Sequence, residues 1–101
     1  MRDVFSESLT KADMPPKSLV PIRPDYPKSS RSRGEEGDVV LSIRVAATGV
    51  AERVDVAVSS GFPDLDNAAV DAARAARFAP AKKGGKPIAS IARLKLSFKL
   101  K

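Results

Sequence analysis

Few residues in this chain have side chains suited to acid–base or nucleophilic chemistry. The sequence contains neither histidine nor cysteine, so it lacks the side chains that most often act as bases and nucleophiles near neutral pH. The same absence removes the commonest transition-metal ligands and every disulfide. We therefore expect no enzymatic activity, no bound metal and no cofactor.

Three short motifs contain the other polar candidates. The carboxylates at 35–38 do not match the ligand number and spacing of a calcium site, so we interpret them as a solvated turn. The serines at 59–61 have no base beside them and no nucleophile-elbow pattern, and they indicate a strand exit into a helix. Gly84-Gly85-Lys86 is similar to part of a phosphate loop, but Pro87 replaces the metal-binding hydroxyl and the element order is reversed, so we interpret it as a hairpin-like loop.

The formal net charge of +6 would attract acidic partners of any kind. Sheets that bind nucleic acid usually add exposed aromatic side chains for base stacking. Here the polar face of the last strand carries lysine and serine, and Phe98 lies on its apolar face. A row of lysines on an edge strand also discourages aggregation through that edge. We therefore expect no specific nucleic-acid partner.

The elements that position these residues follow from hydrophobic periodicity. Residues 1–25 contain four prolines and no period, which favours a flexible linker or tail ahead of one domain at 26–101. A short helical turn is expected after Pro27. Alternation over 38–59 predicts two strands joined near Gly49. The core-facing residues of the second strand are predicted to be Val54, Val56 and Val58.

The second half of the chain predicts one helix and one long strand. The helix is expected over 63–78, with Pro80 preventing its continuation. Its core-facing stripe is predicted at Leu65, Ala69, Ala72 and Ala76. The last strand alternates strictly from Leu94, but Ile91 has the opposite parity, which favours either a bulge near Ala92 or partial cover on both faces. This order predicts an α+β fold, with a three-stranded antiparallel sheet packed on one main helix and a short N-terminal helical turn.

Six short signatures in this order resemble the C-terminal domain family of TonB, the periplasmic energy transducer of Gram-negative bacteria. They are Tyr26-Pro27, the glycine-bounded turn at 34–37, Ser59-Ser60-Gly61, Leu65-Asp66, the helix end at 77–81, and Gly85-Lys86-Pro87-Ile88. The resemblance covers about residues 20–100. The chain departs from the family pattern at Ser30, Glu35 and Ala76, where alanine, a hydrophobic residue and an aromatic residue are usual.

The resemblance implies a docking module that binds the TonB box of an outer-membrane TonB-dependent transporter as an added strand and transmits force for uptake. The implied partner-binding edge is the last strand: Ser90, Ile91, Ala92, Arg93, Leu94, Lys95, Leu96, Ser97 and Phe98. A second implied contact is Ser30, Arg31, Ser32 and Arg33. The resemblance also implies a periplasmic location, with an inner-membrane anchor and a motor complex of the ExbB/ExbD type reached through parts outside this chain.

Two other interpretations stay open. The basic surface also suits a cell-envelope scaffold or binding domain of the same fold that holds an anionic polymer or an acidic protein. An exposed edge and a thin Ala/Val core favour strand-exchanged homodimers as well. No apolar run is long enough for a membrane span or a signal peptide, so any such segment is expected outside these residues.

Overall fold

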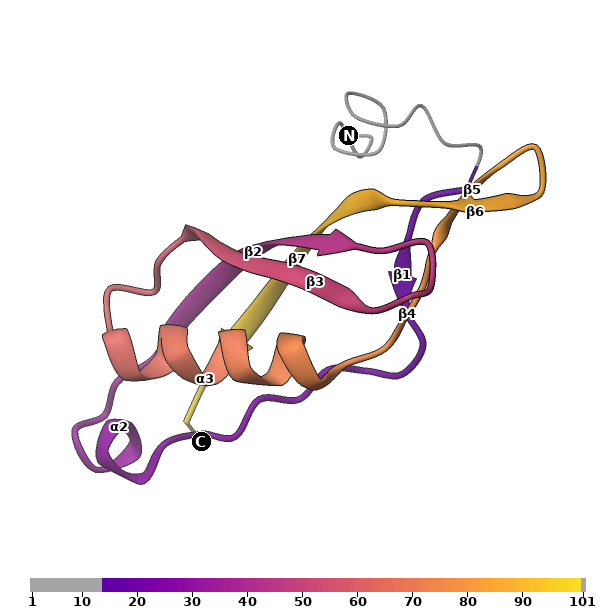
Figure 1. Cartoon of the computed structure of the whole chain (residues 1–101). Helices are drawn as coiled ribbons and strands as arrows, with labels where there is room; N and C mark the ends of the chain where they lie inside the picture. The colour runs from indigo at the N-terminus through magenta and orange to yellow at the C-terminus, as the bar shows by residue number, and fades with distance from the viewer. Residues whose placement is uncertain (1–13, 101) are drawn as a thin grey trace.

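A three-stranded antiparallel sheet in the order β3-β2-β7 forms the centre of the structure, a computed structural model that describes residues 14–100 (Figure 1). Its strands are β2 (Gly37–Val45), β3 (Ala51–Val58) and β7 (Ser90–Phe98). Helix α3 (Pro63–Ala75) lies across one face of the sheet, and the short helix α2 (Lys28–Ser32) lies near one end of it. The predicted α+β fold and the helical turn after Pro27 are confirmed.

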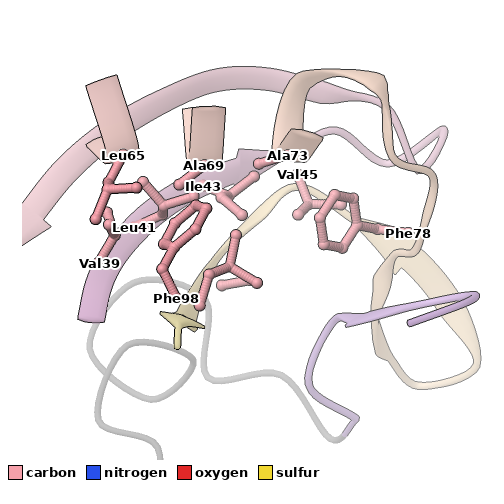
Figure 2. Packing of buried hydrophobic residues seen from close by; sticks show 11 residues of the cluster. Val39, Leu41, Ile43, Val45, Leu65, Ala69, Ala73, Phe78 and Phe98 are labelled. Atoms are coloured by element: carbon pink, nitrogen blue, oxygen red, sulfur yellow. The ribbon is translucent and has the colours of Figure 1, made fainter. Parts of the chain in front are cut away.

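The core lies between β2 and α3, as the alternation in β2 predicts. The four apolar side chains of β2 that face the helix are completely buried: Val39, Leu41, Ile43 and Val45. Figure 2 shows them packed beneath Leu65, Ala69 and Ala73 of α3, with Phe98 and Phe78 completing the cluster. Each buried Val, Leu or Ile contributes about 1.5–3 kcal/mol relative to an exposed one. The small alanines of α3 let the helix approach the sheet closely.

Helix α3 ends at Ala75, three residues before the predicted end. The chain leaves the helix because the following residues pair with the β2–β3 turn: Arg77 bridges Val50, and Phe78 N–H donates to the Gly49 carbonyl at 2.9 Å. The row of buried helix residues is therefore Leu65, Ala69 and Ala73. The predicted members Ala72 and Ala76 are only partly buried.

Gly49 is required at that turn for two reasons. Its φ is +91°, and a Cβ atom there would lie 2.3 Å from the Phe78 carbonyl oxygen. A side chain would therefore force apart the turn and β4 (Phe78–Ala79).

The prediction that Val56 and Val58 face the core is wrong. They are 40% and 49% exposed, and only Val54 packs against the buried cluster. β3 has a strand neighbour on one side only, and its register with β2 shifts twice, once at each end of the pairing. An edge strand that is bulged twists away from its neighbours, so its later side chains escape the cover of α3.

The bulge that Ile91 suggested in the last strand is absent. β7 pairs with β2 in unbroken register from Val45↔Ser90 to Gly37↔Phe98. The small residues Ser90 and Ala92 occupy the core face, and Ile91 lies half-buried on the other face. The alternative, partial cover on both faces, is the one observed.

Two further antiparallel pairs lie at the end of the sheet away from α2. β1 (Lys17–Ser18) pairs with β4, and β5 (Ala81–Lys83) pairs with β6 (Lys86–Ile88) to form a hairpin that projects from the sheet (Figure 1). The hairpin-like loop predicted at Gly84-Gly85-Lys86 is confirmed as the β5–β6 hairpin. The β1–β4 pairing was not predicted, because two-residue strands have no period to detect. Residues 1–13 of the predicted linker lie outside the described residues, so the boundary near residue 25 stays a prediction.

Candidate functional site

The outer edge of β7 is the longest regular strand edge in the central sheet. β2 pairs with all nine residues of β7, and β7 has no strand on its other side in that sheet. Nine strand residues extend over about 30 Å. The outer edge of such a strand presents backbone N–H and C=O groups that can pair with an added chain.

The two faces of β7 differ in what a partner would meet. The face toward the core is formed by Ser90, Ala92, Leu94, Leu96 and Phe98, all buried except Leu94, which is half-buried. The other face carries the exposed side chains of Arg93, Lys95 and Ser97 and the half-buried Ile91. Strand addition would therefore rely on main-chain hydrogen bonds, with side-chain selection mainly on the basic face.

A groove of about 500 Å³ lies beside the C-terminal half of this edge. One wall is residues 95–99, and the other is the extended segment that contains Ile22, Arg23, Pro24 and Tyr26. This segment has no regular secondary structure, and Pro24 has no N–H to donate. The groove therefore leaves space beside β7 for an extended peptide.

Tyr26 fixes the wall of the groove to β7. Its ring packs edge-on against Phe98, with centroids 5.4 Å apart and an interplanar angle of 87°, a favourable aromatic geometry. Its hydroxyl donates to the Glu35 carbonyl, and the Arg31 guanidinium lies 5.5 Å from the ring centre. Partial burial, with the Glu36 carboxylate nearby, raises the pKa of Tyr26 above its ordinary value. The sequence indicated Tyr26 only as part of a signature, because its contact with Phe98 spans most of the domain.

The four predicted residues of the second contact lie in different environments. Ser30 is completely buried, whereas Arg31 and Ser32 are exposed. Arg33 is exposed but engaged within the domain, with ion pairs to Glu35 at 2.7 Å and Asp64 at 3.2 Å. The Arg33 guanidinium in turn lowers the pKa of Glu35. Arg31 contacts the ring of Tyr26, which packs on Phe98 of β7. The wider contact stays a prediction.

Ser59-Ser60-Gly61 forms a structural corner between β3 and α3. The Asp66 carboxylate accepts hydrogen bonds from the Ser59 hydroxyl, from Ser60 N–H at 2.9 Å and from the Ser60 hydroxyl at 2.8 Å. Partial burial opposes ionisation, but these hydrogen bonds hold the pKa of Asp66 below its ordinary value. The hydroxyls are thus committed to the corner, in agreement with the strand-exit interpretation.

No group of three or more acidic side chains among residues 14–100 is arranged to hold a metal ion. No helix in this part of the chain is long and apolar enough to cross a membrane.

The architecture is that of a small α+β domain with one long, regular edge strand bordered by a groove. The family described as the Gram-negative bacterial TonB protein C-terminal domain matches residues 22–100. The chain therefore belongs to this family.

Individual relatives agree with this assignment. The chain is 40% identical over 77 residues to the Pseudomonas aeruginosa protein tonB2 and 36% identical over 88 residues to the TonB protein of Xanthomonas campestris pv. campestris. These matches include 76% and 87% of this chain but only 28% and 39% of the relatives. The chain thus spans well under half the length of these curated relatives.

Solved structures show the same fold. The solution structure of the Pseudomonas aeruginosa TonB C-terminal domain superimposes with a TM-score of 0.68, at 29% identity and with 92% of each chain covered. The corresponding domain from Helicobacter pylori gives a TM-score of 0.59 at 26% identity, over 76% of this chain and 69% of that one.

Proposed function

We propose that this chain is the transporter-binding domain of a TonB-type energy transducer, and that it binds the TonB box of an outer-membrane transporter as a strand added to β7. The observation that carries the proposal is the unbroken nine-residue edge of β7 beside an open groove, in a chain that belongs to the TonB C-terminal family. In this role the domain catalyses no reaction. It holds a transporter segment so that force can be passed to it.

The binding residues in this proposal are Ser90 to Phe98, with the segment from Ser30 to Arg33 at the C-terminal end of the edge. The backbone of β7 supplies affinity, so buried side chains such as Ala92 and Leu96 do not hinder binding. Arg93 and Lys95 select among partners because they are the charged side chains on the exposed face. The same edge would also support a strand-exchanged homodimer, which would compete with the peptide.

The wider setting of the proposal is the cell envelope. The domain would act in the periplasm, anchored to the inner membrane and coupled to a motor complex of the ExbB/ExbD type through parts of the protein outside this chain. The relatives are two to four times longer than the matched region, which supports the existence of such parts in them.

An NMR titration of the labelled chain with peptides from the N-terminal segments of outer-membrane transporters tests the proposal. We expect chemical-shift changes concentrated in 90–98 and in the flanking Tyr26 and Arg31, and we expect them to persist when salt is raised, since main-chain hydrogen bonds are little screened. Two control peptides of the same sequence carry N-methyl groups on the odd-numbered or on the even-numbered residues. Only one of these two sets of N–H groups would face β7, so one control peptide should fail to bind and the other should bind. Shifts that spread over lysines and vanish with salt would reject strand addition.

A further inference from the structure

β1, β4 and the β5–β6 hairpin gather at one end of the sheet (Figure 1), and these segments and their neighbours carry exposed apolar residues and cations. Met14 exchanges backbone hydrogen bonds with Lys82 at 3.1 and 3.0 Å, and Leu19 N–H donates to the Arg77 carbonyl at 3.0 Å. Arg77 also bridges Val50. These contacts bring together a region that we name the basic–apolar end: Met14, Lys17, Leu19, Val20, Val50, Arg77, Lys82, Lys83 and Lys86.

The apolar members of this region are unusually accessible. Leu19 and Val20 are each 63% exposed, Met14 is 58% exposed and Val50 is 40% exposed. Among residues 14–100 the other exposed large apolar side chains are those of Val56 and Val58 on β3. Single exposed apolar residues need no explanation, but a cluster beside charged residues is typical of a binding surface.

Among residues 14–100, few carboxylates lie near this region in the sequence. The sequence has no Asp or Glu between residues 14 and 24 or between 72 and 100. Glu52, two residues beyond Val50, is paired with Arg44 at 3.3 Å. None of the ion pairs within residues 14–100 involves the four lysines of the region.

The β5–β6 hairpin contains an unfavourable pair of like charges. Lys83 and Lys86 are direct cross-strand partners, and like charges in that position destabilise a hairpin. The turn between them is formed by Gly84 and Gly85, whose φ angles of +58° and +79° suit the tight turns that favour hairpins. The fold therefore holds two like charges side by side at a projecting tip, where an anionic surface would relieve their repulsion.

We propose that the basic–apolar end docks on the surface of an anionic phospholipid bilayer. Lysines near such a surface are attracted to the headgroups, and neighbouring aliphatic side chains gain by entering the boundary between headgroups and acyl chains. A protein partner fits less well, because lysine is depleted in the cores of protein–protein interfaces. A soluble polyanion would leave Met14, Leu19 and Val20 in water. The region includes no residue of β7, so this inference does not depend on the proposed function.

Vesicle flotation of the 101-residue chain tests the proposal. We expect binding to vesicles that mix phosphatidylglycerol with phosphatidylcholine, and none to pure phosphatidylcholine. The triple variant Lys82→Gln, Lys83→Gln, Lys86→Gln should lower the partition coefficient roughly a hundredfold, since each lysine near an anionic surface contributes about fivefold. The double variant Leu19→Ser, Val20→Ser should lower it about tenfold.

Matched variants elsewhere on the domain control for nonspecific effects of charge and polarity. The triple variant Lys28→Gln, Arg74→Gln, Lys99→Gln removes the same charge at other sites and should change partitioning less than about threefold. Val56→Ser with Val58→Ser is the apolar control and should have no effect. Circular dichroism and thermal unfolding verify that each variant is folded.

Three results would overturn the proposal. The first is no binding to anionic vesicles at low salt. The second is an equal loss in the hairpin variant and its charge control. The third is binding to dextran sulfate as strong as to vesicles, with the Leu19→Ser, Val20→Ser variant unaffected, which would assign the region to soluble polyanions.

Discussion

The two edge strands of the central sheet, β3 and β7, differ in the regularity of their pairing with β2. β3 shifts register against β2 at two places and carries two ion pairs, Arg44–Glu52 and Arg53–Asp55. β7 is one residue longer and runs in unbroken register. Each of these strands has a strand neighbour on one side only, but β7 alone pairs with β2 in unbroken register.

This difference shows how one sheet can be open to strand addition at one edge and protected at the other. Bulges and alternating charges are common devices that prevent unwanted pairing, and β3 has both. The central claim is therefore that β7 accepts a strand and β3 does not.

Loss of a large side chain should be far more costly at the β7 edge than at the β3 edge. Phe98 is 2% exposed and packs against Tyr26, so Phe98→Ala should lower the free energy of unfolding by about 3–5 kcal/mol. Val58 is 49% exposed, so Val58→Ala should lower it by less than about 1 kcal/mol. Urea unfolding measures both, and similar losses would contradict the assigned burial.

The corner that attaches β3 to α3 should make the domain sensitive to acid. Asp66→Asn removes a charged acceptor of three hydrogen bonds and should lower the free energy of unfolding by about 1–2 kcal/mol at neutral pH. The pKa of Asp66 is lowered on folding, so its contribution is present above the unfolded pKa of about 3.9 and is lost as pH falls below it.

Unfolding measured from pH 7 to pH 2 tests this sign. Wild type should lose stability below about pH 4, and Asp66→Asn should lose less over the same range. Asp71→Asn, at an exposed position of the same helix, is the control and should keep the wild-type profile. An unchanged profile in Asp66→Asn would contradict the role of the corner.

A buried hydroxyl at the start of β7 should be dispensable. Ser90 is 3% exposed, and its Oγ has no hydrogen-bond partner within the described chain. Ser90→Ala should therefore raise the free energy of unfolding by up to about 1 kcal/mol, because it removes an unsatisfied polar group. Ser60→Ala should lower it, since that hydroxyl is bonded to Asp66. A large loss in Ser90→Ala would reveal a partner for this hydroxyl.

The smallest effect is expected from removing charges on β3. The double variant Arg53→Thr, Asp55→Thr breaks an exposed ion pair and should change stability by less than about 0.5 kcal/mol. Its bulges stay in place, so transporter peptides should still perturb β7 and its flank, and leave β3 unperturbed, in NMR spectra. Peptide-induced shifts on β3 of this variant would mean that charge, and not the bulges, protects that edge.

The sequence predicted those parts of the molecule whose periodicity is long. The buried row of β2, the β2–β3 hairpin and the last strand from Leu94 onward follow from alternation. The exposed ends of β3 did not, because alternation does not reveal whether a strand is covered. A bulge near Ala92 was one of two predicted alternatives and is absent. The residues on the core face there, Ser90 and Ala92, are too small and too weakly apolar to show in the sequence which face is buried.

The site was predictable only in its strand. Residues 90–98 lie at the edge that the resemblance implied, whereas the wall of the groove is formed by Ile22 to Tyr26, about 70 residues earlier in the chain. Contacts over such separations leave no local pattern. The burial of Ser30 and the engagement of Arg33 with Asp64 escaped prediction for the same reason.

Amide hydrogen exchange of the chain, free and saturated with a transporter peptide, tests the central claim most directly. An added strand bonds to the outward N–H groups of β7, so we predict new protection at alternate residues between Ser90 and Phe98 and no change along β3. Protection gained on β3, or a bound peptide that leaves the exchange of β7 unchanged, would contradict it.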